Sequence, residues 1–263
     1  MTRDRGPIFL GGCPRSGLTL IRVMLDAHPR ISCGPDSGVL SIARAARELG
    51  ETLGDLHARD FHLPPEEVRA NFADAIARIL GARAQGAKAR FAEKSPLNLL
   101  FFEDYAAMFP AARFIHVVRD GRDVAASLLA RAWKDPRTGR VFEYCASAEG
   151  AARYWKGMVR LGLSAETALG RRVLRVRYED LAAAPEPTLR ALCAFLDEPY
   201  AAEMLRFNER ALDLAGMEGE SAAALKERVS PRFVGRHARE LGPGDVARIG
   251  EIARDELDAL GYA

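Results

Sequence analysis

Residues Pro7 to Arg22, PIFLGGCPRSGLTLIR, constrain the fold of this chain more than any other stretch. The short apolar run of residues 8–10 predicts a buried strand. Glycines and a proline then predict a tight loop, and the apolar periodicity of residues 18–27 predicts a helix. Backbone N–H groups of such a loop converge at the helix N-terminus, where the helix dipole favours an anion. The stretch therefore predicts a phosphate- or sulfate-binding loop.

The spacing within this loop points to one class of nucleotide site and away from another. Gly12 to Thr19 matches the loop of nucleoside triphosphatases, Gly-x-x-x-x-Gly-Lys-[Ser/Thr], except that Leu18 stands in place of the lysine. Arg15 is the only cation within the loop sequence. Because kinases and ATPases use that lysine on terminal phosphates, the sequence disfavours both. For the loop taken alone, a glycine turn with a stray arginine is the alternative.

Composition sets the outer limits of the interpretation. The 263 residues suffice for one large α/β domain, which we expect to span 1–263. Charged residues make up 28% of the chain and cancel to +2, so the overall charge indicates neither a nucleic-acid nor a membrane partner. No apolar run is long enough to cross a bilayer and no signal segment is evident, so we expect a cytoplasmic protein. The four cysteines lack the paired spacing of a zinc site.

Alternating strands and helices predict an α/β fold with a parallel sheet covered on both faces. Further strands are expected at 30–33, 90–94, 113–119 and 172–178, and helices at 95–109, 124–132, 146–169, 185–196, 201–212 and 243–260. The Ala- and Leu-rich segment 38–82, interrupted by Gly50, Gly54 and Pro64-Pro65, predicts three helices that form a cap over the ligand end of the sheet. We expect a polar loop at 134–140 near the substrate.

Charged side chains follow three of the predicted strands. Asp36 comes soon after the second strand, Lys94 ends the third and Arg119 ends the fourth. Open α/β sheets bind ligands at the carboxyl ends of their strands, so these side chains are candidate ligand contacts. The alternatives are a turn aspartate, a surface lysine and an arginine in a structural salt bridge.

These motifs together resemble the nucleotide-sulfate-dependent sulfotransferases, closest to the tyrosylprotein branch and its bacterial relatives. The resemblance rests on the first loop, Glu93-Lys-Ser-Pro96, Phe114 to Val124 with Ser127, Arg177-Tyr-Glu-Asp-Leu181 and Leu260-Gly-Tyr262. It implies a P-loop NTPase-like, three-layer α/β/α fold. It also implies a donor, 3′-phosphoadenosine 5′-phosphosulfate (PAPS), which leaves as adenosine 3′,5′-bisphosphate (PAP), and a transfer that requires no metal.

The resemblance also assigns a donor site. The first loop would hold the 5′-phosphosulfate, Arg119 and Ser127 the 3′-phosphate, and the basic loop 222–242 would cover the donor. The donor-binding residues implied in this way are Pro14, Arg15, Ser16, Gly17, Leu18, Thr19, Arg119, Ser127, Tyr178, Ser230 and Arg232. Arginine suits such a site because its planar guanidinium pairs with phosphate bidentately. For the basic loop, a solvated run of charges is the alternative.

Three residues would carry the chemistry. By the resemblance, Arg15 and Lys94 stabilise the charge on the transferred and leaving groups, and Asp36 accepts the proton of the acceptor hydroxyl. Asp36 stands where the tyrosylprotein branch has glutamate, which is one methylene longer. His28 and His116 are alternative bases, although a helix terminator and a packed core histidine are the structural interpretations of these two.

The expected acceptor is a hydroxyl on a small molecule, a sugar or a tyrosine-like phenol. Leu18 and Gly38 depart from the family pattern, which has a threonine and, near the acceptor, an arginine at these positions. Gly38 argues against the acidic peptides of the tyrosylprotein branch. The short length and the absence of an evident signal segment favour a bacterial, cytoplasmic enzyme. The alternative functions are a P-loop small-molecule kinase and a non-catalytic nucleotide-binding module. The oligomeric state, monomer or homodimer, is open.

Overall fold

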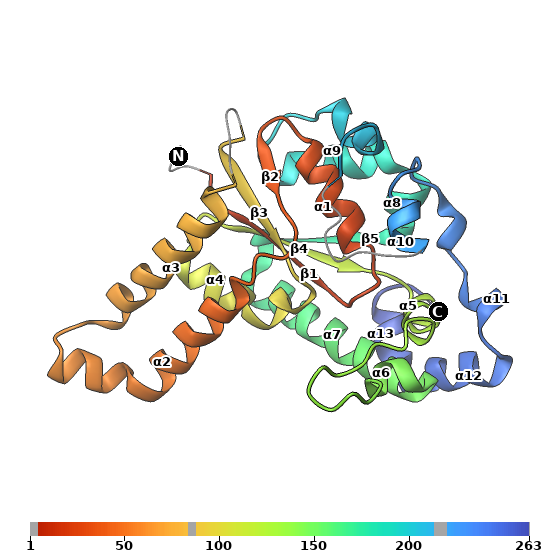
Figure 1. Ribbon diagram of the computed structural model, residues 1–263, viewed down its shortest axis with the longest axis horizontal. Coiled ribbons are helices and arrows are strands. Elements are labelled where there is room, and N and C mark those ends of the chain that lie inside the picture. Colours follow the sequence, from red (N-terminus) through yellow and green to blue (C-terminus); the bar gives the residue numbers. More distant parts are fainter. Residues whose placement is uncertain (1–4, 84–87, 213–219, 263) are drawn as a thin grey trace.

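A five-stranded parallel sheet forms the centre of the protein (Figure 1). The computed structural model describes residues 5–83, 88–212 and 220–262. The strand order is β2-β3-β1-β4-β5. The strands are β1 (Ile8–Gly12), β2 (Ile31–Cys33), β3 (Arg90–Lys94), β4 (Arg113–Val118) and β5 (Val173–Arg177). All five predicted strands and the predicted α/β class are confirmed.

The strand register brings the candidate residues to one edge of the sheet. Leu10 of β1 pairs with Lys94 of β3 on one side, and Gly12 pairs with Val117 of β4 on the other. Val118 in turn pairs with Arg177 of β5. Because every strand is parallel, the segments that follow β1, β3, β4 and β5 all leave the sheet at this carboxyl edge.

Helices cover both faces of the sheet, which gives three layers. One face packs against α1 (Leu18–Ala27), α8 (Tyr178–Ala183), α9 (Pro185–Phe195) and the 3₁₀ segment η3 (Ala202–Glu209). The other packs against α4 (Phe102–Met108), α5 (Gly121–Leu129), α7 (Ala148–Leu169), α12 (Pro243–Ile252) and α13 (Arg254–Ala259). Successive residues of β1 face opposite layers, as Phe9 lies in one core and Leu10 in the other.

Residues 38–82 form two helices, so the expectation of three was wrong. They are α2 (Leu40–Asp60) and α3 (Pro65–Gly81), a hairpin that projects from the body of the protein (Figure 1). Gly50 and Gly54 do not end α2, because each glycine costs a helix only about 1 kcal/mol. Pro64-Pro65 does break it, since proline starts α3 at its first position.

Other helix boundaries also differ from the expected ones. Residues 96–101 form a 3₁₀ helix, η1 (Pro96–Phe101), before α4, and a short α6 (Glu143–Ala146) precedes α7. The 3₁₀ segment η3, kinked at Arg206, replaces the helix expected at 201–212. A break at Ala253 divides the last helix into α12 and α13.

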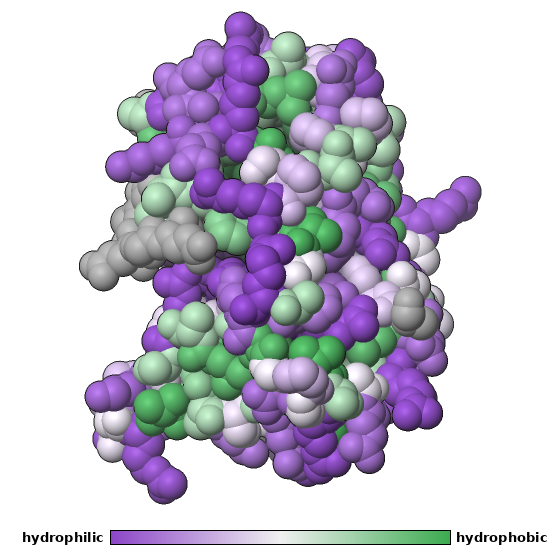
Figure 2. Space-filling view, turned by 90° about the vertical axis from the view of Figure 1, so that its right-hand side faces the viewer, coloured by the Kyte–Doolittle hydropathy of each residue, from purple (hydrophilic) through white to green (hydrophobic). Residues whose placement is uncertain are grey.

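The basic segment 222–242 lies on the right-hand side of Figure 1. It includes the end of α10 (Glu220–Ala224), a 3₁₀ turn η4 (Pro231–Phe233) and α11 (His237–Glu240). Hydrophilic residues cover most of that side, and hydrophobic ones gather mainly in a band across its lower half (Figure 2). In the part of the chain that the structure describes, no helix is long and apolar enough to span a membrane.

Candidate active site

The loop between β1 and α1 is held in a tight, partly left-handed conformation. Arg15 has a φ of 76° and Gly17, the N-cap of α1, has a φ of 95°. Gly17 is needed for a second reason, because an added Cβ would lie 2.6 Å from Cδ2 of Tyr178. Ser16 is fully buried, and its Oγ has no hydrogen-bond partner among the described residues. A buried hydroxyl without a partner is costly, so it marks a position where a ligand oxygen fits.

Two loop residues have side chains that face the protein interior. Leu18 is 5% exposed and packs in the core beneath α1, so only its backbone can contribute to an anion site. Cys13 is also buried, and burial raises the pKa of its thiol well above the ordinary value. The thiol is therefore a packing group rather than an activated nucleophile.

Arg119 is the centre of the site and is 4% exposed. Its Nη1 donates to the backbone oxygen of Arg15 at 3.1 Å, and its Nη2 pairs with Asp123 at 3.3 Å and also donates to the backbone oxygen of Phe233. The guanidinium carbon lies 4.4 Å from the ring centroid of Tyr178. Its buried Nε has no partner among the described residues, so this N–H is left for a ligand.

Asp123 fastens the basic segment to α5. Its fully buried carboxylate accepts hydrogen bonds from the backbone N–H of Gly235 at 2.9 Å and of His237 at 3.0 Å. The His237 Nδ1 lies 2.6 Å from the same carboxylate. Burial acts to raise the pKa of Asp123, but the hydrogen bonds from His237 and the charge of Arg119 outweigh it and hold that pKa below its ordinary value. Asp123 thus joins the basic segment to Arg119.

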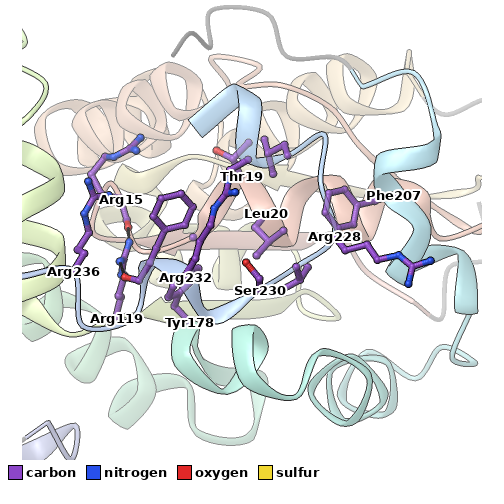
Figure 3. A pocket seen from close by; sticks show the side chains of 15 residues that line it. Arg15, Thr19, Leu20, Arg119, Tyr178, Phe207, Arg228, Ser230, Arg232 and Arg236 are labelled. Atoms are coloured by element: carbon purple, nitrogen blue, oxygen red, sulfur yellow. Dashed lines mark hydrogen bonds between the residues drawn. The ribbon is translucent and has the colours of Figure 1, made fainter. Parts of the chain in front are cut away.

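A pocket opens between the loop, Arg119 and the basic segment (Figure 3). Arg15, Arg119 and Arg236 gather at one end of it, and Phe207 and Arg228 lie at the other. Among the described residues, the lining contains five arginines and no Asp or Glu: Arg15, Gly17, Thr19, Leu20, Arg119, Tyr178, Phe207, Ala224, Leu225, Arg228, Val229, Ser230, Arg232, Phe233 and Arg236. A pocket of this composition suits a ligand with several negative charges and an apolar part.

The predicted donor residues fall into two groups. Arg15, Gly17, Thr19, Arg119, Tyr178, Ser230 and Arg232 line the pocket. Ser127 does not, but its Oγ accepts a 2.9 Å hydrogen bond from Arg15 Nε at one end of it. Pro14, Ser16 and Leu18 do not line the pocket either. Arg232 pairs with Glu227. Sequence reasoning missed Phe207 and Leu225, since isolated apolar residues carry no motif.

Asp36 and Lys94 lie at the same edge of the sheet but outside this pocket. Asp36 is exposed in the turn between β2 and α2, and its Oδ1 accepts from the backbone N–H of Gly38 at 3.3 Å. Lys94 ends β3 beside Leu10 of β1. Glu93 directly precedes Lys94 on β3, is 1% exposed and accepts a hydrogen bond from Ser37, the residue after Asp36. The motif that contains Glu93 assigned it no role. The available signal was a carboxylate directly before Lys94 at the end of a predicted strand.

The two alternative histidine bases have structural partners. The Nε2 of His28 lies 2.9 Å from the backbone oxygen of Pro199, and its Nδ1 accepts from the backbone N–H of Arg30. His116 is 1% exposed and lies 2.6 Å from Glu166, under α7. Both are packed within the fold rather than presented to the pocket. Within the described residues, no three His, Cys, Asp or Glu side chains cluster as metal ligands would.

The fold is that of a P-loop-type α/β protein, and its arginine-lined pocket suits an anionic ligand. The sequence profile of the Sulfotransferase family matches residues 7–202. The chain therefore belongs to the sulfotransferase family.

Individual relatives agree with this assignment. The chain is similar to the protein-tyrosine sulfotransferase of Drosophila melanogaster, with 30% identity over 268 residues that cover 99% of this chain and 52% of the relative. It thus spans about half the length of that protein. The sulfotransferase domain of the Synechococcus PCC 7002 olefin synthase superposes with a TM-score of 0.65 at 24% identity, covering 94% of both chains. Mouse sulfotransferase SULT7A1, solved in complex with PAP, has a TM-score of 0.58 at 14% identity, covering 96% of this chain and 84% of the mouse chain.

Proposed function

We propose that this protein transfers a sulfuryl group from PAPS to a hydroxyl group of its acceptor. The observation that carries the proposal is the arginine-lined pocket, in which the buried Arg119 Nε has no partner among the described residues, together with the unpartnered Ser16 Oγ in the loop between the lining residues Arg15 and Gly17. These atoms and the N-terminus of α1 suit phosphate and sulfate oxygens. The apolar end near Phe207 and Leu225 suits the adenine ring.

Each charged residue has a role in this scheme. The donor supplies the sulfuryl group, whose sulfur forms a bond to the acceptor oxygen as its bond to the 5′-phosphate oxygen breaks. Arg15 and Lys94 stabilise the charge that develops on the transferred and leaving oxygens, as fixed cations do in phosphoryl transfer. Asp36 takes the proton of the acceptor hydroxyl. Arg119 and Ser127 hold the 3′-phosphate, and the basic segment 222–242 covers the donor.

The acceptor is proposed only as a hydroxyl on a small molecule, sugar or phenol. The Drosophila relative acts on protein tyrosine by its name, and phenols are therefore the first acceptors to test. The α2–α3 hairpin contributes no described residue to the donor pocket and begins shortly after Asp36, so we place the hairpin on the acceptor side. A cytoplasmic location and a bacterial source stay predictions from the sequence.

Calorimetric titration followed by a transfer assay tests the proposal. We expect PAP to bind without magnesium, and to bind more tightly than ATP with magnesium. With PAPS carrying labelled sulfur, the label should appear on a phenol such as N-acetyltyrosine amide. Preference for ATP with magnesium would favour the kinase instead, and PAP binding without transfer to any of a broad panel of hydroxyls would favour a non-catalytic binding module.

A further inference from the structure

The buried carboxylate of Glu93 is bonded to both donors of a single exposed residue, Ser37. The Ser37 Oγ donates to Glu93 Oε2 at 2.7 Å, and the Ser37 backbone N–H points to Oε1 at 3.4 Å. Glu93 is 1% exposed, whereas Ser37 lies on the surface. A carboxylate is costly to bury, and one that engages a surface turn through two bonds fixes that turn to the sheet.

The turn fixed in this way is the one that presents Asp36. Asp36, Ser37 and Gly38 are all exposed, and Gly38 has a left-handed φ of 73° with open space around it. The turn's other bonds are longer: the Gly38 N–H lies 3.3 Å from Asp36 Oδ1, the Val39 N–H lies 3.4 Å from Ser37 Oγ, and the Ser41 N–H donates to the Gly38 oxygen at 3.0 Å. The 2.7 Å bond to Glu93 is therefore its strongest attachment.

The attachment point matters because Glu93 directly precedes Lys94 on β3. Lys94 is held in register with Leu10 of β1, next to the loop that begins the donor site. A turn tied to Glu93 is thus placed relative to Lys94 and to the end of β1. A base must lie within hydrogen-bond reach of the proton it removes, and an aspartate reaches less far than a glutamate, so the position of its turn is critical.

We propose that Glu93 is a positioning residue that acts through Ser37 to hold Asp36 beside Lys94 for removal of the acceptor proton. The inference rests on the proposed function, in which Asp36 is the base. Glu93 itself does not contact the acceptor. Ser37 is the exposed member of this pair and Glu93 the buried one.

The surroundings of Glu93 add a pH dependence. Burial raises the pKa of Glu93 to about 7, and the charge of Asp36 adds to the rise, whereas the hydrogen bonds from Ser37 and the charge of Lys94 oppose it. Tyr105 of α4 and Cys33 of β2 also face this carboxyl and are neutral, since burial raises the pKa of both. Because the ionised carboxylate is the stronger acceptor for Ser37, the turn is held more firmly as pH rises through 7.

The test uses the full chain and the variants Ser37→Ala, Glu93→Gln and their combination, with Ser41→Ala as a matched control on the exposed start of α2. We expect kcat with a phenolic acceptor to fall about 10- to 100-fold in Ser37→Ala, because a displaced base costs that much. The double variant should be no slower than the slower single variant, since the two residues act as one unit. PAP binding should be unchanged in these variants. A Ser37→Thr variant, which keeps a hydroxyl that can donate to Glu93, should have the wild-type kcat.

The pH profile separates positioning from a general structural role. In the wild type kcat should rise with pH around 7, and this rise should be absent in Glu93→Gln. If wild-type protein neither binds PAP nor transfers sulfate, the proposed function and this inference both fail. If wild-type transfer is normal and Asp36→Asn abolishes it, but Ser37→Ala and Glu93→Gln keep the wild-type kcat and pH profile, the inference alone is overturned. Should Glu93→Gln not fold, Ser37→Ala decides the question by the same kcat criterion.

Discussion

Arg15 Nε donates a 2.9 Å hydrogen bond to Ser127 Oγ, joining two residues that are 112 positions apart in the sequence. The bond connects the loop after β1 to α5. Arg119 adds a second connection through its 3.1 Å bond to the backbone oxygen of Arg15. The two halves of the proposed donor site, one for each phosphate end, are therefore a single bonded unit.

Replacement of Arg119 should weaken PAP binding. Arg119→Ala removes a buried guanidinium that faces the pocket, and loss of such a charged partner costs about 2 kcal/mol or more, equivalent to about a 30-fold rise in Kd. Arg119→Lys should not restore affinity, because a lysine lacks the planar fork. Titration calorimetry with PAP measures both. Arg190→Ala on α9, whose arginine is exposed and paired with Glu186, is the control and should bind as wild type.

Replacement of Lys94 should slow transfer without loss of donor binding. Lys94→Ala removes a cation from the carboxyl edge of the sheet, and we expect kcat to fall about 10²- to 10³-fold, as when one transition-state donor is lost. Lys88→Ala provides the matched comparison, since Lys88 lies just before the opposite end of β3 and bonds Asp26. A Lys94→Ala enzyme with the kcat of Lys88→Ala would remove Lys94 from the mechanism.

Glu166 should make the fold sensitive to acid. Burial acts to raise its pKa, but hydrogen bonds from His116 and Arg175 lower that pKa to about 2. Because this pKa is lower in the folded protein than in the unfolded chain, ionised Glu166 stabilises the fold at any pH above about 4.5. This stabilisation is lost as pH falls from about 4.5 towards 2. Glu166→Gln should therefore lower the free energy of unfolding by about 2 to 3 kcal/mol at pH 7 and by little at pH 2. Urea unfolding at both pH values measures this, and an equal loss at both would contradict it.

Loss of the hydroxyl should lower the stability of the protein at Tyr262 but not at Tyr200. The Tyr262 hydroxyl donates to Glu179 at 2.8 Å, and Glu179 accepts from the Asp120 backbone N–H, next to Arg119. Tyr262→Phe should cost about 1.5 to 3 kcal/mol of stability, the range for bonds to charged groups. The Tyr200 hydroxyl is buried without a partner among the described residues, so Tyr200→Phe should be neutral or stabilising. Thermal unfolding of the two variants, side by side, gives the comparison.

Two glycines of α7 test the packing under His116. An added Cβ at Gly162 would lie 2.0 Å from Cε1 of His116, whereas at Gly157 it would meet open space. Gly162→Ala should destabilise the protein by about 1 to 3 kcal/mol through overpacking. Gly157→Ala should stabilise it by up to about 1 kcal/mol, because alanine favours the helix. If denaturant melts show the same sign for both, the close approach of His116 to α7 is wrong.

The sheet and the first loop could be predicted because they depend on sequence patterns only a few residues long. Alternating and continuous apolar runs bounded by Gly and Pro placed all five strands, because these signals act within a few residues. The prediction of three helices in 38–82 was wrong because Gly50 and Gly54 do not end α2, since a glycine inside a helix costs only about 1 kcal/mol. Proline, which removes a donor and fixes φ, gave the correct break.

Long-range contacts explain what sequence reasoning missed in the site. Asp123 binds His237, 114 residues away, and nothing in either local sequence indicates this pairing. Glu93 gained its significance only when β2 and β3 brought Ser37 beside it. The roles of Asp36 as the base and of Lys94 as a charge-stabilising cation rest on the family resemblance, and the kinetic experiments test both.

The left-handed backbone of Arg15 means that selection for stability and selection for activity favour different residues at position 15. An arginine at a φ of 76° costs about 1 to 2 kcal/mol that a glycine would not, yet its guanidinium is the cation of the first loop. A library selected only for thermal resistance should therefore enrich Gly or Asn at position 15, and one selected for turnover should keep Arg. Thermostability engineering of this protein thus needs an activity screen at every round, because a stabilising change at position 15 would remove a proposed donor-site cation.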